Sequence, residues 1–205
     1  MKKVAVIDYG MGNLHSVVKA LENKDVPVKV VSTGSSLKNC AGIVLPGVGA
    51  FGDAVKEIKK RKFYTAVTEM VKSGIPILGI CLGMQLLMEK SREFGEHKGF
   101  GFIKGSTTAF RGKIKVPHMG WNSIEKRKSD LILKGIKDKK PAYFVHSYYV
   151  RPADERDVLT VTEYGKTLFT SAISRDNVYG FQFHPEKSGE EMLKIYENFY
   201  KICGR

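Results

Sequence analysis

The sequence contains few cysteines and no long apolar run. None of its apolar stretches reaches the roughly 18 residues that a membrane-spanning helix needs. The run at residues 4–7 ends at Asp8, too early for the core of a secretory signal. The only three cysteines are Cys40, Cys81 and Cys203, and they form no CxxC pair. This usage argues against a disulfide framework or a zinc knuckle, and it predicts free thiols in a reduced compartment, the cytoplasm.

Acidic residues are also scarce. The chain has 21 Asp and Glu against 34 Lys and Arg, which gives a net charge of +13. The basic residues gather at 56–62, 125–128 and 134–140. Such runs suit either a surface for an acidic partner or nucleic acid, or ordinary solvated faces. Because no aromatic residue lies within them and no nucleic-acid-binding motif accompanies them, we expect neither a nucleic-acid nor a membrane partner.

The first ninety residues alternate between strand and helix patterns. Apolar runs predict strands at 2–10, 26–31, 41–47 and 75–80. Helical spacing predicts helices over 14–21, with Asn13 as the cap, over about 53–72, and from residue 82 onward. Strands joined by helical crossovers indicate a parallel sheet with helices on both faces.

The second half has a different pattern. Short β segments between residues 99 and 180 are separated by glycines and polar turns, which predicts hairpins at "EYGK" and "RDN". A last helix is expected from about residue 189, where Ser188 and Glu191 have the spacing of a capping box. The sequence thus predicts an α/β fold with a single domain over residues 1–205. Its sheet is open, mostly parallel and flanked by helices, and its second half is rich in β-hairpins.

A cysteine lies between two glycines where the fourth strand gives way to a helix. "GICLG", residues 79–83, has the glycine–x–nucleophile–x–glycine pattern of an elbow that lifts a nucleophile above a sheet. The following helix would favour a thiolate at Cys81, and the N–H of Leu82 would point toward an oxyanion. The alternative is a buried structural cysteine. A nearby base would decide between the two.

The candidate base is a histidine that follows the last apolar strand. His184 precedes Pro185, which favours an extended backbone, so the His184 ring and the Glu186 carboxylate can share one side. A carboxylate beside imidazole fixes its tautomer, as in a catalytic triad. The alternative is a surface turn without a role. If the last strand is parallel to the first four, Cys81 and His184 meet at one edge of the sheet.

A third segment, "LPGVGAFG" at residues 45–52, follows a strand that ends at the same edge. Gly47 and Gly49 allow the backbone to turn an N–H inward as a second oxyanion donor. The alternatives are a tight turn or a phosphate loop, although the GxxxxGK[ST] pattern is missing. A zinc deaminase would need P-C-x-x-C after "HPE", and a papain-like protease would need C-G-[SA]-C-[WY]. Neither pattern occurs, and we expect no metal.

Several motifs together resemble a known family. "GICLGMQ" and "FHPE" are similar to the motifs of class I glutamine amidotransferases, which hydrolyse glutamine and pass ammonia to a partner. Within that family, five further segments resemble the glutaminase subunits of imidazole glycerol phosphate synthases. They are "DYGMGN" (8–13), "PGVGAFG" (46–52), "PHMGWN" (117–122), "YFVHSYY" (143–149) and "GFQFHPEKS" (180–188). The match is collinear over nearly the whole chain.

The resemblance implies a catalytic machinery without a cofactor. Cys81 attacks the glutamine amide, His184 protonates the leaving ammonia and activates water, and Glu186 orients His184. The implied oxyanion hole consists of Leu82, Gly47, Val48 and Gly49. The implied glutamine-binding residues are Gln85, Glu93, His146, Ser147 and Tyr148.

The resemblance also implies a partner, a (β/α)8-barrel synthase subunit in a heterodimer. The implied interface residues are Asn13, Trp121, Tyr143 and Lys187. Ammonia would cross this interface and yield imidazole glycerol phosphate and AICAR in histidine biosynthesis. In this family the glutaminase is nearly silent until the barrel binds its ligand, and we expect the peptides at Gly47, Val48 and Gly49 to turn inward only in the active complex.

Three other functions remain open from the sequence. A paralogous glutaminase subunit would supply ammonia for sugar amidation in surface-polysaccharide biosynthesis. A basic nucleic-acid-binding protein on the same fold would not need Cys81, His184 and Glu186 together. A stand-alone cysteine hydrolase would act without any partner.

Overall fold

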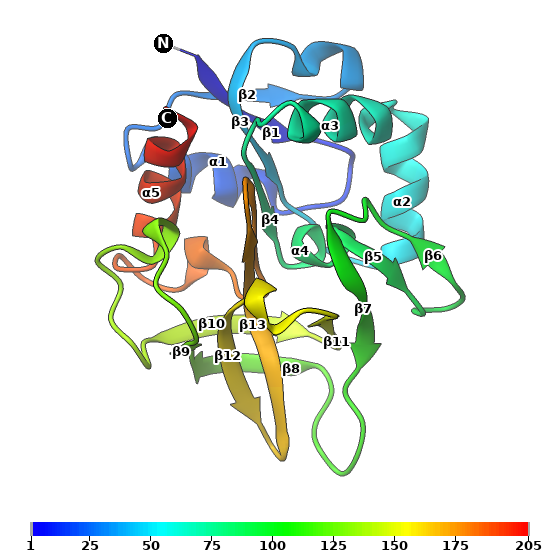
Figure 1. The fold of residues 1–205 in the computed structure, drawn as a ribbon, viewed down its shortest axis with the longest axis vertical. Coiled ribbons are helices and arrows are strands. Elements are labelled where there is room, and N and C mark those ends of the chain that lie inside the picture. Colours follow the sequence, from blue (N-terminus) through cyan, green and yellow to red (C-terminus); the bar gives the residue numbers. More distant parts are fainter. Residues whose placement is uncertain (1, 205) are drawn as a thin grey trace.

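The computed structural model describes residues 2–204, in which strands and helices alternate before a mostly β second half (Figure 1). The helices are α1 (Leu14–Glu22), α2 (Phe51–Lys60), α3 (Phe63–Lys72), α4 (Leu82–Leu86) and α5 (Lys194–Cys203). The strands are β1 (Lys3–Ile7), β2 (Val28–Val31), β3 (Cys40–Leu45), β4 (Ile77–Ile80), β5 (Met88–Ser91), β6 (His97–Lys98), β7 (Ile103–Ala109), β8 (His118–Ser123), β9 (Glu125–Lys126), β10 (Pro141–His146), β11 (Tyr148–Pro152), β12 (Val158–Tyr164), β13 (Thr167–Arg175) and β14 (Val178–Phe181). The domain predicted for residues 1–205 includes Met1 and Arg205, which lie outside the described residues.

The main sheet is mixed, and the five strands at one end of it are parallel to one another. Their order is β2-β1-β3-β4-β14, and β14 runs parallel to β4, with Phe181 beside Ile80. The sequence left the direction of this last strand open. Because it is parallel, the residues that follow β4 and β14 emerge at the same edge of the sheet.

Helices cover both faces of this parallel part, and the alternation along β1 explains why. Val4 and Val6 pack into a core with residues of α1 and α5, whereas Ala5 and Ile7 pack with residues of α2 and α3. Figure 1 shows α1 and α5 on one side of these strands and α2 and α3 on the other. Strands buried on both faces read as continuous apolar runs, which is why the sequence revealed them.

The second half is rich in antiparallel hairpins, as predicted, although β7 and β14 each also pair in parallel with a strand of the first half. β13 pairs with β11, β12 and β14, and the predicted hairpin turns are present at Gly165, with φ 62°, and Asp176, with φ 51°. β8 and β10 form a separate two-stranded ribbon in which Trp121 stands opposite Tyr143. A membrane-spanning helix would have to be longer and more apolar than any helix of residues 2–204.

Two predicted helices were too long. The helix expected over 53–72 is broken between α2 and α3, where Lys62 has φ 60°. Arg61 O accepts a hydrogen bond from Gly34 N at 2.9 Å, and a Cβ on Gly34 would lie 2.0 Å from Lys62 O. This close tertiary contact breaks the helix. The helix from residue 82 is only five residues long, because Met88 pairs with Ile103 of β7 and starts a strand.

The predicted capping box is also wrong, and α5 starts later than residue 189. The Ser188 hydroxyl accepts from Tyr143 N at 2.9 Å and donates to His184 O. Glu191 instead accepts from Lys137 N at 2.7 Å. Both side chains therefore tie the segment after β14 to other parts of the fold rather than to a helix end.

Candidate active site

Cys81 occupies a strained elbow between β4 and α4. Its backbone has φ 55° and ψ −111°, a combination that non-glycine residues rarely adopt. Cys81 N donates to Phe181 O at 2.8 Å, and Cys81 O accepts from Gln85 N at 3.2 Å. The residue is thus held by β14 on one side and by the first turn of α4 on the other. This is the geometry predicted for a nucleophile at the end of a strand.

The two flanking glycines are required by close packing. A Cβ on Gly79 would lie 2.7 Å from backbone atoms of Gly83, and a Cβ on Gly83 would lie 1.8 Å from Leu45 O. No side chain fits at either position without moving the backbone. The glycine pattern around Cys81 is therefore a consequence of the tight elbow.

His184 and Glu186 form the predicted pair. His184 Nδ1 and Glu186 Oε1 are 2.8 Å apart, and both side chains are buried. Tyr196 donates its hydroxyl to Glu186 Oε2 at 3.0 Å, and His184 N donates to Tyr143 O at 3.0 Å. With Nδ1 facing the carboxylate, Nε2 is the nitrogen left for proton transfer. Tyr196 was not recognised in the sequence.

The electrostatic surroundings favour a protonated His184. Burial by itself lowers the pKa of the imidazole, but its interactions with the Cys81 sulfur and with Glu186 outweigh burial and raise the pKa to about 10. Nε2 is buried and has no hydrogen-bond partner among the described atoms. Hydrogen bonds between catalytic groups are often long or poorly aligned before a substrate binds.

Two further groups contact the Cys81 sulfur. Gln182 Nε2 lies 3.6 Å from Sγ, and Val145 O accepts from Sγ at 3.9 Å. Neither residue was recognised in the sequence. Gln182 precedes His184 by two residues on an extended chain, so the spacing rule that paired His184 with Glu186 could have found it.

A pocket of about 310 Å³ opens beside the sulfur. All five predicted glutamine-binding residues line it, together with Cys81, Leu82 and the exposed tip of the glycine loop. Its walls are Val48, Gly49, Cys81, Leu82, Gln85, Glu93, Pro117, Val145, His146, Ser147 and Tyr148. This volume is at the small end of ligand pockets and suits a single amino acid.

Polar side chains in the pocket are held by the surrounding structure. Gln85 Nε2 donates to Tyr148 O and to Gln182 Oε1, both at 3.0 Å. Glu93 Oε2 accepts from Phe51 N, the first residue of α2, at 2.7 Å. In each side chain, one polar atom is thus held by the surrounding protein and the other is left for a ligand.

The His146 ring belongs to a buried hydrogen-bond network with His118, in which both rings are neutral. His146 Nδ1 donates to Tyr148 O at 2.8 Å, and its Nε2 lies 3.1 Å from His118 Nδ1. Burial lowers the pKa of His146 to about 3 and that of His118 to about 4. A carbonyl can only accept, so Nδ1 of His146 carries its proton and His118 donates to Nε2. The ring of His146 therefore supports the wall of the pocket.

The proposed oxyanion donor is already occupied in this structure. Leu82 N donates to Gly47 O at 3.3 Å, so the loop presents a carbonyl to this N–H. Gly49 has φ 99°, and a Cβ there would lie 2.9 Å from Met11 Cε. Val48 and Gly49 line the pocket. The carbonyl oxygen of Gly47 instead accepts the hydrogen bond from Leu82, which lines the pocket. An oxyanion hole at Leu82 requires this loop to change conformation.

Comparison with known families agrees with the site. The sequence model described as "Glutamine amidotransferase class-I" matches residues 5–203. The chain belongs to the class I glutamine amidotransferases. The predicted family is thereby confirmed.

Relatives of this amidotransferase share most of its length. A protein from Aquifex aeolicus named "Imidazole glycerol phosphate synthase subunit HisH" is 50% identical over 198 residues, covering 96% of this chain and 95% of the relative. A protein of the same name from Desulfitobacterium hafniense (strain Y51) is 46% identical over 198 residues, covering 97% and 93%.

Solved structures agree on the fold. The structure of PurLQS from Thermotoga maritima matches with a TM-score of 0.78 at 20% identity, covering 98% of this chain and 99% of that chain. A crystal structure described as that of a glutamine amidotransferase matches with a TM-score of 0.78 at 18% identity, covering 98% and 99%. The predicted single-domain α/β fold of the amidotransferase is therefore confirmed.

Three of the four predicted interface residues of the amidotransferase lie together. Trp121 and Tyr143 face each other across the β8–β10 ribbon with ring centroids 6.1 Å apart. Lys187 Nζ stands 5.9 Å from the centroid of the Tyr143 ring. Asn13 precedes α1 at the N-cap position without making the predicted side-chain cap, and α1 packs against the 3₁₀ turn that contains Lys187.

Proposed function

We propose that this amidotransferase is the glutaminase subunit of an imidazole glycerol phosphate synthase in histidine biosynthesis. The observation that carries the chemistry is the interaction of the Cys81 sulfur, at its elbow, with His184 of the buried His184–Glu186 pair. The names of relatives that are 46–50% identical over nearly the whole chain support the pathway. The thiols of the described cysteines are free, which suits the cytoplasm.

The reaction begins with attack of the Cys81 sulfur on the side-chain carbonyl carbon of glutamine. The carbon–nitrogen bond breaks, and His184 Nε2 gives its proton to the departing ammonia, which leaves a γ-glutamyl thioester on Cys81. His184 then takes a proton from water, whose oxygen attacks the thioester and releases glutamate. Glu186 holds His184 in the tautomer and orientation that both steps need.

The pocket provides the remaining contacts. Gln85, Glu93 and the segment of His146, Ser147 and Tyr148 bind glutamine beside the sulfur. Glu93 has one carboxylate oxygen on Phe51 N, and its other oxygen is the partner for the α-ammonium group of the substrate. The amino-acid end is thereby anchored while the amide reaches Cys81.

The oxyanion hole is closed in the isolated chain, and this accounts for a silent glutaminase. The hydrogen bond from Leu82 N to Gly47 O must be broken before that N–H can stabilise an oxyanion. A missing donor costs about 3–4 kcal/mol in the transition state. Binding of the partner and its ligand turns the peptides at Gly47, Val48 and Gly49 so that they add an N–H to the hole.

An exposed apolar surface beside the pocket is the docking site for the partner. Val48, Val116, Met119 and Trp121 are 43%, 44%, 62% and 60% exposed, respectively. Val48 lines the pocket, and Trp121 contacts Tyr143, which in turn contacts Lys187. A (β/α)8-barrel synthase subunit covers this surface and receives the ammonia.

The test is to supply the barrel subunit of a histidine-pathway synthase with its nucleotide ligand and two nitrogen sources. With glutamine, formation of imidazole glycerol phosphate should require the amidotransferase and should vanish in Cys81→Ala. With ammonium salt, the barrel alone should form the product. Product formation from glutamine only with a sugar-amidating barrel would overturn the proposed pathway while leaving the glutaminase chemistry intact.

A further inference from the structure

A second cavity lies next to the glutamine pocket and is strongly basic. It has a volume of about 490 Å³, and Tyr148 lines both cavities. Its wall contains four cationic side chains, Lys90, Arg92, Arg111 and Arg151, and several hydroxyls, among them those of Ser106 and Thr108. We call this cavity the basic groove. Glutamine hydrolysis does not account for these cations.

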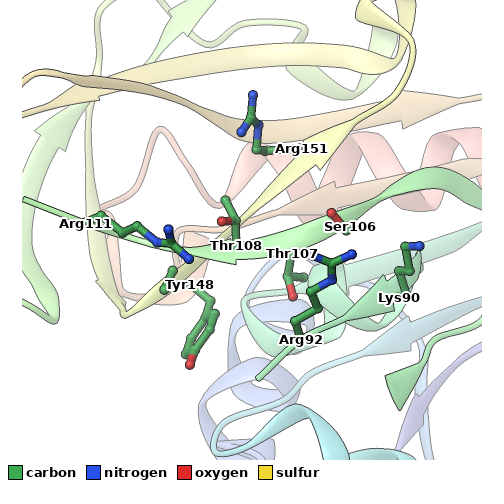
Figure 2. A pocket seen from close by; sticks show the side chains of 9 residues that line it. Lys90, Arg92, Ser106, Thr107, Thr108, Arg111, Tyr148 and Arg151 are labelled. Atoms are coloured by element: carbon green, nitrogen blue, oxygen red, sulfur yellow. The ribbon is translucent and has the colours of Figure 1, made fainter. Parts of the chain in front are cut away.

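The groove is built across three neighbouring strands, β5, β7 and β11. Lys90 of β5 and Arg151 of β11 both pair in register with Ser106 of β7, so these three side chains share a face of the sheet. Figure 2 shows Arg151 on one side of the β7 segment and Lys90 and Arg92 on the other, with Arg111 near one end of it. The cations thus surround the cavity instead of meeting at one point.

The charge of the groove is not neutralised by the protein. No carboxylate lines it, and among the described residues neither an ion pair nor a hydrogen bond engages the head groups of its four cations. Elsewhere on the chain, Arg156 and Arg175 are paired with Asp154 and Asp157. Four unpaired cations in one concavity repel one another, and a bound anion would relieve that repulsion.

We propose that the basic groove binds a ligand that carries two or more phosphate groups. Guanidinium groups match phosphate oxygens with two parallel hydrogen bonds, and the hydroxyls of Ser106 and Thr108 add further donors. A ligand with several anionic groups reaches cations on both sides of β7, whereas a single carboxylate engages one side only. The cavity volume is sufficient for a molecule of nucleotide size.

The test uses inorganic pyrophosphate and isothermal titration of the whole chain at low salt. We expect saturable binding with a stoichiometry near one pyrophosphate per chain. The affinity should fall at least about tenfold in the double variant Arg92→Gln/Arg151→Gln. The control, Lys38→Gln/Lys72→Gln, removes the same charge outside the groove and should bind like the wild type. Equal weakening in both variants, or no saturable binding by the wild type, would overturn the proposal.

An independent observation concerns Gln182, which is fully buried at the end of β14. Its Oε1 accepts from Gln85 Nε2 at 3.0 Å, and its Nε2 lies 3.6 Å from Cys81 Sγ. The orientation of the amide follows from its neighbours. Gln85 Nε2 also donates to the carbonyl of Tyr148, which can only accept, so Gln85 presents its nitrogen to Gln182. Gln182 must then present its NH₂ group to the sulfur.

We infer that Gln182 is a catalytic residue that donates a hydrogen bond to the sulfur of Cys81 when that sulfur carries negative charge. The inference rests on the proposed role of Cys81 as nucleophile. Hydrogen bonds to the charged form of a group favour that form. Burial strengthens this effect, because water does not compete for the sulfur at this position.

The test follows alkylation of Cys81 by iodoacetamide as a function of pH, with mass spectrometry to locate the label. In Gln182→Met the donor is lost at similar volume, so the rate at pH 7 should fall about threefold to tenfold and the midpoint of the profile should move to higher pH. In Gln182→Glu, which adds a negative charge, the midpoint should move further. Thermal unfolding confirms that each variant is folded.

If the pH dependence of Cys81 alkylation in both folded variants equals that of the wild type, the proposed role of Gln182 is wrong. Alkylation of the wild type without any pH dependence near neutrality would instead contradict the proposed role of Cys81. The two failures are therefore distinguishable, and neither readout requires the barrel partner.

Discussion

The peptide N–H of Leu82 donates a hydrogen bond to the carbonyl oxygen of Gly47, with nitrogen and oxygen 3.3 Å apart. This bond is longer than the typical value of about 2.9–3.0 Å. For the isolated chain to be slower by about 10²-fold, breaking this bond and turning the glycine loop must together cost about 3 kcal/mol, which binding of the partner supplies. In the proposed mechanism, the nucleophile Cys81 and the base His184 are thus in place while the oxyanion hole at Leu82 is closed.

The loop that closes the hole should be sensitive at Gly49. This residue has φ 99°, and a Cβ on it would lie 2.9 Å from Met11 Cε. In Gly49→Ala we expect a folded protein whose stimulation by partner and ligand falls at least about tenfold, because one missing oxyanion donor costs that much or more. The measurement is the ratio of glutamate release with and without the ligand of the barrel.

The matched control for this substitution is Gly74→Ala. Gly74 has φ 93°, and nothing lies within 4 Å of a Cβ built there. The Gly74→Ala substitution imposes similar backbone strain far from the pocket. The stimulation of this variant by partner and ligand should therefore equal that of the wild type. An unchanged ratio in Gly49→Ala would contradict the proposed loop movement.

Replacing Glu186 should affect turnover far more than glutamine binding. In Glu186→Gln the amide can present its NH₂ group to His184 Nδ1, which disfavours the tautomer with a proton on that nitrogen. We expect kcat in the complex to fall by about 10²–10⁴, with KM nearly unchanged because Glu186 does not line the pocket. Tyr196→Phe removes only the second contact to Glu186 and should cost about tenfold or less. Equal effects of the two variants would argue against the orienting role.

Stability should fall in mild acid because of His118 and His146. Burial lowers their pKa values to about 4 and about 3, below the ordinary 6.5. Between those values and pH 6.5 the unfolded chain binds protons that the folded chain does not. Their contribution is thus complete above pH 6.5 and is lost as the pH falls toward 4 and 3. Urea unfolding at pH 7 and pH 5 measures the loss.

A variant separates this effect from other acid effects. His118→Gln removes one of the two buried titrations, so the difference in unfolding free energy between pH 7 and pH 5 should shrink. His15→Gln changes an exposed histidine and should leave that difference as it is in the wild type. His184 has the opposite sign: its pKa is raised to about 10, so its contribution is lost as the pH rises from 6.5 through 10.

The elbow should not tolerate a methyl group at Gly83. A Cβ there would lie 1.8 Å from Leu45 O, so Gly83→Ala must displace either α4 or β3. We expect a loss of at least about 3 kcal/mol of unfolding free energy, against about 1 kcal/mol for Gly74→Ala. Denaturant unfolding of both variants checks this. Similar losses in the two would mean that the elbow is not tightly constrained.

The sequence was sufficient for features that depend on local spacing. The glycines around Cys81 predicted the elbow after β4, and the two-residue spacing of His184 and Glu186 predicted the contact between their side chains after β14, because each pattern is set by the backbone at one strand end. The parallel strands could also be predicted, because strands buried on both faces are apolar throughout. The same spacing would have pointed to Gln182, but "FQF" was interpreted only as an apolar strand.

Features that depend on distant segments could not be predicted. The break at Lys62 results from the close approach of Gly34, nearly thirty residues earlier in the chain. The hydrogen bond between Leu82 and Gly47 joins two segments that are far apart in the sequence, so local spacing does not reveal it. The basic groove collects cations from three strands, and a net charge of +13 does not reveal where they meet.

The most direct test of the account is glutamate release from glutamine by the purified chain, measured alone and with the histidine-pathway barrel and its nucleotide ligand. We expect a low rate for the isolated chain, because the Leu82 N–H is occupied. Adding both the barrel and its ligand should raise the rate at least about 10²-fold, and this rise should be absent in Cys81→Ala. Full activity of the isolated chain, or a rise that persists in Cys81→Ala, would contradict the account.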